Sequence, residues 1–241
     1  TLSGGMDSSV LLYMAQDRDF EEIHTVTFDY GQRHKRELDC VKKQITNFNT
    51  QFSSWFNLKV TNKVLDVNYI RDIAPTSSLT NTDIDNPDIS KIAGDAQPVS
   101  YVPFRNLMFL SICSAYAESV DADTVWYGAA QVDSLAGYWD GSEEFVDTVN
   151  EVTKLNRENR IEIEAPLLDM SKEDIIKEGI RLGVKFGDTW TCYSDREDGL
   201  ADATTPSSSM RVKGFISAGY QDPIVYLQQE KIDKLYLSLK D

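Results

Sequence analysis

The sequence has few cysteines and no long apolar run. Its 241 residues include three cysteines, Cys40, Cys113 and Cys192, which are far apart and odd in number. Such usage does not build a disulfide scaffold, and no two of them share the spacing of metal ligands. We therefore expect a reducing, cytoplasmic setting. No apolar stretch approaches the roughly 20 residues of a membrane span, and no leader pattern suggests secretion.

Basic residues are also scarce relative to acidic ones. Lys and Arg number 24 against 39 Asp and Glu, which gives a formal net charge of −15. A protein that binds nucleic acid through its phosphates normally presents a basic face, so this balance argues against a general nucleic-acid surface. The 24 cations still leave room for a local basic pocket that binds a small anion.

The sequence has enough apolar residues, 41%, to build a sizeable core. Alternating or β-branched runs predict strands over residues 23–28, 59–67, 124–130 and 160–167. Helical spacing predicts helices over residues 33–48, 105–119, 142–159 and 171–182, with a last one from Tyr226. This alternation predicts an α/β fold, with a mostly parallel sheet and helices on both faces.

Some boundaries and loops can be predicted in more detail. Ser171 is expected to cap the helix over 171–182 with Asp174 in the capping-box position, and Gly183 is expected to end it. Helix 105–119 is apolar enough to be buried. Residues 74–98 are expected to form a long surface loop, a candidate mobile lid. Residues 192–213 are expected to be polar and rich in turns.

The strongest local signal is the run Ser3-Gly4-Gly5-Met6-Asp7-Ser8-Ser9, between the last residues of a strand and a helix. We expect the rest of that strand upstream of Thr1. Glycines let the backbone approach a phosphate, and a helix N-terminus supplies N–H groups and partial positive charge. The serines add hydroxyl donors. No lysine follows the second glycine, so this is not the GxxxxGK[ST] loop. The alternative is an ordinary glycine turn.

This run resembles the PP-loop of the ATP pyrophosphatase superfamily. The resemblance implies that residues 3–9 bind the pyrophosphate of ATP, that the substrate becomes an AMP ester, and that Asp7 acts through Mg²⁺ or shapes the loop. ATP and Mg²⁺ are thus the implied cofactors.

Further blocks follow in order along residues 1–223. They are Phe28–His34, Tyr101–Asn106, Gly137–Asp140 with Glu144 and Phe145, Pro166–Lys172 and Thr189–Tyr193. Together they resemble the 7-cyano-7-deazaguanine synthase family. That implies a Rossmann-like fold of the adenine nucleotide alpha hydrolase type over residues 1–190, with a C-terminal extension over 191–241. It also implies a dimeric ATP-dependent carbon–nitrogen ligase of queuosine biosynthesis. The substrate 7-carboxy-7-deazaguanine and ammonia would react through an adenylate and an amide to the nitrile.

The resemblance also implies roles for particular side chains. Asp7, Lys172 and Arg105 would be catalytic. The substrate-binding set would be Tyr30, Gln32, Arg33, His34, Arg105, Asn106, Asp133, Tyr138 and Asp140. Arginine suits bidentate contact with an anion, and carboxylates can accept hydrogen bonds from a guanine-like base. Tyr138 or Trp139 could stack on that base. The alternatives are a solvated loop for 30–34, a loop-capping arginine at 105, a solvated lysine at 172 and simple packing for the rest.

The family's zinc site is where this sequence departs most. Its first cysteine corresponds to Cys192, but the other three fall on Asp202, Thr205 and Ser208. One thiolate cannot hold a tetrahedral zinc ion, so we expect zinc to be lost and assign no metal ligand. The segment 194–209 must then be held by hydrogen bonds or be flexible.

Two smaller departures concern the expected substrate site. Phe104 stands where the family usually has glycine, and Gly141-Ser142 stands where it has an arginine. They put the second half-reaction and the nucleophile in doubt, so three hypotheses remain. In the first hypothesis the protein is an ordinary family enzyme that uses ammonia. In the second it is a decayed ATP-binding regulatory module. In the third hypothesis it is a specialised relative in antiviral defence or phage modification, which conjugates the deazaguanine to a protein N-terminus or another macromolecule.

Overall fold

A computed structural model describes residues 1–18, 20–31, 36–52, 59–81, 83–85, 97–131, 138–192 and 198–238. Four of the expected substrate-binding residues, Gln32, Arg33, His34 and Asp133, lie outside these ranges.

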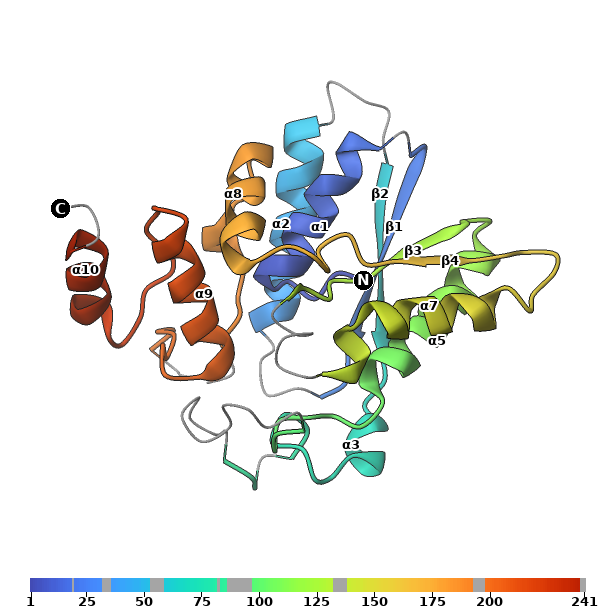
Figure 1. Cartoon of the computed structure of the whole chain (residues 1–241), viewed down its shortest axis with the longest axis horizontal. Helices are drawn as coiled ribbons and strands as arrows, with labels where there is room; N and C mark the ends of the chain where they lie inside the picture. Colours follow the sequence, from blue (N-terminus) through green and yellow to red (C-terminus); the bar gives the residue numbers. More distant parts are fainter. Residues whose placement is uncertain are drawn as a thin grey trace.

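Two pairs of parallel strands form the centre of the molecule (Figure 1). β1 (Glu22–Asp29) pairs with β2 (Lys59–Asp66), and β3 (Thr124–Trp126) pairs with β4 (Glu162–Glu164). The first residues of the chain bridge the pairs: Leu2 N–H donates to the Val26 carbonyl at 2.9 Å, and the Thr1 nitrogen donates to the Trp126 carbonyl at 2.6 Å. The predicted α/β fold with parallel strands is confirmed.

Helices cover both faces of these strands. α1 (Met6–Met14), α2 (Arg36–Phe52) and α8 (Lys172–Leu182) lie on one side, and α5 (Arg105–Ser119) and α7 (Glu143–Thr153) on the other (Figure 1). Successive side chains of a strand point to opposite faces. In β1, Ile23 accordingly packs with Val10 and Phe48, whereas Val26 and Phe28 belong to the opposite apolar cluster.

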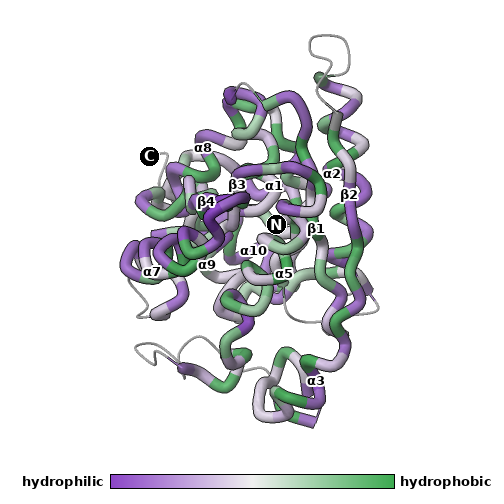
Figure 2. Tube along the Cα trace, turned by 90° about the vertical axis from the view of Figure 1, so that its right-hand side faces the viewer, coloured by the Kyte–Doolittle hydropathy of each residue, from purple (hydrophilic) through white to green (hydrophobic). Residues whose placement is uncertain are grey.

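α2 shows how a polar sequence still forms a buried helix face. Its hydropathy alternates along the helix in Figure 2, and the buried residues are Cys40, Val41, Gln44 and Phe48. They recur at helical spacing, so one stripe faces the core and the charged side chains face solvent.

The predicted ends of α8 are confirmed. The Ser171 hydroxyl accepts from the Asp174 N–H at 3.2 Å, and the Asp174 carboxylate accepts from the Ser171 N–H at 3.1 Å. Gly183 ends the helix with a φ of +83°, a conformation that favours glycine. Helix α7 is likewise capped by the Ser142 hydroxyl, which accepts from the Phe145 N–H.

Several predicted elements prove shorter than expected. The strands over 124–130 and 160–167 span only Thr124–Trp126 and Glu162–Glu164, and the helix over 142–159 ends at Thr153. The last helix, α10 (Gln229–Ser238), begins after Tyr226. In α5 only Leu110, Cys113 and Ala117 are buried, so the expectation of a buried helix holds for one stripe. Short helical turns complete the description: η1 (Ala15–Asp17), α3 (Ile70–Ile73), η2 (Trp139–Gly141) and η3 (Phe186–Asp188).

The expectation of a surface loop over 74–98 is wrong for its described first part. Ser77, Ser78, Leu79 and Thr80 are buried. The Ser77 hydroxyl donates to the Ser100 carbonyl, and the Thr80 hydroxyl donates to the Ala74 carbonyl at 2.6 Å. These side chains satisfy backbone groups locally, which lets a polar segment fold inward. Residues 82 and 86–96 of this segment lie outside the described ranges.

The expectation of a turn-rich segment over 192–213 holds for the described residues 198–205 but is wrong for its last part, because α9 (Pro206–Ser217) begins inside it. Proline fits the first turn of a helix, where its missing N–H costs nothing. The helix packs on α8: a Cβ added at Gly214 would lie 2.9 Å from both the Ile176 and Lys172 side chains. Phe215 is buried in the cluster between α1 and α8.

Cys40, Cys113 and Cys192 are all buried free thiols. Among the described residues, no helix combines the length and the apolar character needed to cross a bilayer.

Candidate active site

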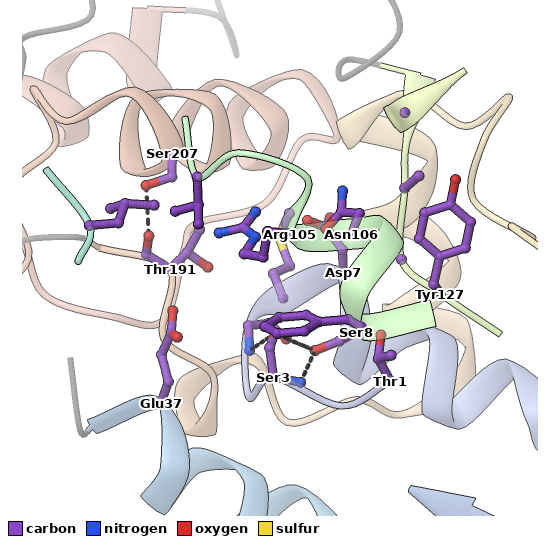
Figure 3. Close-up of a pocket in the computed structure, with 18 of the residues that line it drawn as sticks. Thr1, Ser3, Asp7, Ser8, Glu37, Arg105, Asn106, Tyr127, Thr191 and Ser207 are labelled. Carbon is purple, nitrogen blue, oxygen red and sulfur yellow. Dashed lines mark hydrogen bonds between the residues drawn. The ribbon is translucent and has the colours of Figure 1, made fainter. Parts of the chain in front are cut away.

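A cleft of about 380 Å³ opens where the strands end. Several of its lining residues come directly after residues 1–2, after β1 and after β3. Among them are Ser3 and Tyr127, which Figure 3 labels, and Tyr30. Ligands of open parallel sheets bind at these carboxyl ends. The cleft is therefore placed where the topology favours a site.

The predicted phosphate loop forms one wall of the cleft. Gly4 has a φ of +84°, and a Cβ there would lie 2.2 Å from the Glu37 carbonyl oxygen, so only glycine lets the loop pack against α2. The Ser3 hydroxyl lies 3.0 Å from that of Ser8 and accepts from the Gly5 N–H at 3.3 Å. The N-cap residue of α1 is Gly5, which has no side chain to accept hydrogen bonds from the first N–H groups of the helix. The first-turn N–H groups of this helix can therefore bind an anion in the cleft.

Not every residue of the run reaches the cleft. Gly5, Met6, Asp7 and Ser8 line it together with Ser3, whereas Gly4 and Ser9 do not. The Ser9 hydroxyl donates to the Gly5 carbonyl at 2.8 Å. Gly4 and Ser9 thus hold the shape of the loop.

Asp7 and Lys172 meet across the packed helices α1 and α8. The Lys172 ammonium lies 2.8 Å from Asp7 Oδ2. The Lys172 side chain is 16% exposed and the Asp7 side chain 26%. The second carboxylate oxygen, Asp7 Oδ1, is buried and has no hydrogen-bond partner among the described residues. A buried acceptor left in this way costs free energy, so an orphan oxygen in a cleft indicates a place for a ligand.

A second cluster forms at the N-terminus of α5. Burial raises the pKa of the Asp140 carboxyl, while nearby Arg105 and a hydrogen bond from Asn106 act in the opposite direction. Burial also raises the pKa of Tyr30, which contacts Arg105. The structure thus brings Tyr30, Arg105, Asn106 and Asp140 together in the cleft. Tyr138 also lines the cleft. The Trp139 indole instead donates to the Tyr101 hydroxyl at 3.0 Å.

Phe104, immediately before α5, has an unusual backbone. Its φ is +54°, in the left-handed region, and its side chain is 57% exposed. Its ring packs edge-on against Trp139 with centroids 5.3 Å apart. This conformation costs an L-residue about 1–2 kcal/mol and costs glycine nothing. The departure noted at this position therefore has an energetic cost in the fold.

Glu37 is a site residue that the sequence reading missed. It lies in the first turn of α2, is half-buried and lines the cleft. Burial raises the pKa of its carboxyl to about 8, against the attraction of Arg105. A signal did exist: Glu37 stands four residues before Val41, on the apolar face of an amphipathic helix. Burying a carboxylate at such a position costs free energy, so its presence there indicates a functional role. Tyr101, Thr191 and Ser207 also line the cleft without having been predicted.

The four positions of the family's zinc site do converge. Cys192 Sγ accepts from the Asp202 N–H at 3.2 Å and lies 3.9 Å from the Thr205 hydroxyl, which donates to Ser208 at 2.9 Å. One thiol and two hydroxyls do not make a zinc site. Within the described ranges, no group of three or more His, Cys, Asp or Glu side chains could hold a metal ion. The residues therefore do not fit zinc, and hydrogen bonds hold this corner.

A buried ion pair ties the same segment to the rest of the molecule. Arg211 is fully buried, and its guanidinium donates to both Asp222 oxygens at 2.7 and 2.9 Å. It also donates to the Thr189 hydroxyl at 2.6 Å, and the Tyr226 hydroxyl donates to Asp222. Near the cleft, Ser207 donates to the Thr191 carbonyl at 2.7 Å. The segment thus builds a cleft wall.

Fold and cleft together define an α/β protein with a polar cleft at the ends of its parallel strands. The chain belongs to the family of the queuosine biosynthesis protein QueC, whose family model matches residues 1–219.

Curated relatives agree with this family over nearly the whole chain. The 7-cyano-7-deazaguanine synthase of Clostridium kluyveri is 36% identical over 231 residues, covering 93% of this chain and 95% of the relative. That of Picrophilus torridus is 36% identical over 243 residues, covering 99% and 95%. The 7-cyano-7-deazaguanine synthase 1 of Colwellia psychrerythraea is 38% identical over 224 residues, covering 93% and 95%.

A solved structure similar to this chain is the U34-tRNA thiolase NcsA from Methanococcus maripaludis with its [4Fe-4S] cluster. The match covers 99% of this chain and 70% of the thiolase, at 13% identity and a TM-score of 0.48.

Proposed function

We propose that this protein is an ATP-dependent carbon–nitrogen ligase that makes a queuosine precursor. It adenylates the carboxylate of 7-carboxy-7-deazaguanine and passes the acyl group to ammonia, giving the amide and then 7-cyano-7-deazaguanine. Relatives named 7-cyano-7-deazaguanine synthase match almost the whole chain. The observation that carries the proposal is that the phosphate loop and the Arg105–Asn106–Asp140 cluster line one cleft.

The loop and the Asp7–Lys172 pair form the ATP end of the proposed site. The α1 N-terminus and the hydroxyls of Ser3 and Ser8 bind the pyrophosphate part of ATP. Lys172 offers a positive charge to the same phosphates. The unpartnered oxygen of Asp7 fits a hard cation, because Mg²⁺ prefers oxygen ligands. When bound, Mg²⁺ supplies charge that offsets the phosphates.

The α5 cluster forms the substrate end. Arg105 orients the substrate carboxylate for attack on the α-phosphorus, and Arg105 and Lys172 stabilise the charge that develops there. Asp140 accepts hydrogen bonds from the amidine edge of the deazaguanine, and Tyr138 stacks on its ring. The pyrophosphate leaves along the loop, and the substrate remains as an adenylate.

Mass spectrometry and pyrophosphate release test this proposal. We expect incubation with ATP, Mg²⁺ and 7-carboxy-7-deazaguanine to release pyrophosphate only when the substrate is present. Added ammonia should give the amide and then the nitrile. Absence of substrate-dependent pyrophosphate release would contradict the proposal.

A second candidate differs only in the acceptor. Phe104 keeps an exposed aromatic ring in a costly conformation between two cleft residues, Tyr101 and Arg105. Such a ring favours contact with an acceptor larger than ammonia, such as a protein N-terminus or another macromolecule. The same assay separates the two: a mass gain on a partner protein, with no nitrile formed from ammonia, would favour this candidate.

A further inference from the structure

Glu37 is an acidic side chain that lines the cleft and has no role in the proposed adenylation. Its carboxyl group points into the cleft toward Thr191 (Figure 3). Its backbone carbonyl meets the phosphate loop at Gly4, so the residue is held at a fixed place beside that loop. Among the described residues, burial and the nearby charge of Arg105 are the influences that act on its carboxyl group.

The surroundings of Glu37 are suited to proton transfer. The charged and titratable groups that face it are Arg105 from α5, Tyr30 after β1 and Cys40 on α2 itself. Arg105 hydrogen-bonds to Tyr30. Its positive charge also attracts the Glu37 carboxylate, which lowers the pKa of Glu37 by less than burial raises it. Loss of water around the carboxyl raises the pKa of Glu37 to about 8. A general base works best when its pKa lies near the working pH.

Building on the proposed function, we propose that Glu37 is the general base that deprotonates the amine as it displaces AMP from the adenylate. The amine nitrogen attacks the acyl carbon, a carbon–nitrogen bond forms, and the carbonyl electrons move to oxygen. Collapse restores the carbonyl and breaks the bond to the phosphate oxygen, so AMP leaves. The nitrogen's surplus proton passes to the Glu37 carboxylate and then to solvent. The balance is adenylate plus ammonia giving amide, AMP and one proton.

This role separates the two halves of the reaction. Adenylation needs no proton acceptor, because the substrate carboxylate is already ionised. Transfer to an amine does need one, because the nitrogen becomes cationic when it attacks. Glu37 therefore acts in the second half only.

The test measures both halves in the full-length protein. Substrate-dependent exchange of labelled pyrophosphate into ATP reports adenylation, and mass spectrometry of the amide with ammonia reports transfer. We expect Glu37→Gln to slow amide formation by about 100-fold or more, within the usual range for a general base, while exchange changes little. At a fixed concentration of free NH3, which removes the contribution of the ammonium equilibrium, the wild-type amide rate should rise with pH and level off above about 8, and the variant should lose this rise.

Asp39→Asn is the matched control. Asp39 stands in the same helical turn, is exposed and pairs with Lys42. The control should keep both activities and the pH profile. A cooperative thermal unfolding transition in each variant would show that both fold.

Each other outcome overturns the inference. If Glu37→Gln forms amide at the wild-type rate with the same pH profile, Glu37 is not the base, although the proposed function stands. If exchange and amide formation fall together, Glu37 acts in adenylation or substrate binding instead. If the wild type itself shows no exchange, the proposed function fails and this inference fails with it.

Discussion

At the scale of single residues, the cleft gathers side chains whose polar atoms are left for a ligand. Asp7 offers one oxygen to Lys172, and its other oxygen is buried without a partner in the part of the chain that the structure describes. Glu37 is held in the cleft at a pKa of about 8. Asp140 is buried with Arg105 and Asn106 nearby. Groups placed in this way cost stability in the empty site, which is typical of positions selected for function.

Replacing Asp7 by alanine should abolish substrate-dependent pyrophosphate release. The variant loses both the buried oxygen Oδ1 and the partner that holds Lys172 at 2.8 Å. Pyrophosphate assays measure the effect, and circular dichroism checks the fold. Asp17→Ala is the control, because Asp17 forms an exposed ion pair with Arg181 away from the cleft. Retained release in the Asp7 variant would contradict the catalytic role.

The raised pKa of Glu37 predicts how stability depends on pH. The folded carboxyl binds a proton more tightly than the unfolded one, whose ordinary pKa is 4.5. Its contribution to the free energy of unfolding is therefore largest at acid pH and is lost as the pH rises from about 4.5 to about 8. Urea unfolding over this range should show that Glu37→Gln gains stability relative to the wild type as the pH rises. A constant difference would contradict the shifted pKa.

Phe104 allows a comparison between two variants. Phe104→Gly and Phe104→Ala both remove the ring that contacts Trp139, but only glycine suits a φ of +54°. The glycine variant should therefore be more stable than the alanine variant by about 1 kcal/mol. Urea unfolding of both proteins measures this. Equal stabilities would mean that the left-handed conformation costs nothing.

At the scale of helices and strands, local chemistry explains which elements could be predicted. α8 has a complete capping box and a C-terminal glycine, and its predicted ends match the structure. α9 has no such pattern: three serines follow Pro206, and its contacts with α8 are made by Gly214 and Phe215. Its apolar residues are too few to reveal a helical period, so packing on α8 stabilises it.

Removing the cap of α8 should destabilise the protein. Ser171→Ala leaves the Asp174 N–H without its acceptor and should cost about 1 kcal/mol of unfolding free energy. Ser111→Ala is the control, because the Ser111 hydroxyl only donates to the Leu107 carbonyl within α5. A cost at Ser171 no larger than at Ser111 would contradict the role of the cap.

At the scale of the whole molecule, the C-terminal segment is tied down without a metal. The buried Arg211–Asp222 pair and the hydrogen bonds around Cys192 join α9 and the last residues to η3 and the cleft wall. The four positions of the family's zinc site still lie close together. The corner therefore gathers these positions through hydrogen bonds, with one thiol among their side chains.

Restoring the thiolates should therefore restore a metal site. The triple variant Asp202→Cys, Thr205→Cys and Ser208→Cys joins Cys192 to make four sulfur ligands, the donor set of structural zinc sites. We expect about one zinc ion per chain by atomic absorption and an unfolding temperature that rises with added zinc. Adding Cys192→Ser to the triple variant should weaken binding. A triple variant that binds no zinc would show that the four positions do not converge.

By itself, the sequence determined the alternation of strands and helices, the glycine turn before α1 and the ends of α8. These depend on residues close together along the chain, through periodicity, glycine conformations and caps. It also predicted that Arg105, Asn106 and Asp140 belong to one site, through a family resemblance.

Only the tertiary structure decided which side chains face the cleft and what their surroundings do to them. Glu37 titrates near pH 8 because packing against the loop and α5 removes its water, which no local pattern encodes. Ser77–Thr80 are buried and Ser9 turns away from the cleft because of hydrogen bonds made on folding. Burial and charge at a site depend on segments far apart in the chain, so they exist only once those segments have packed together.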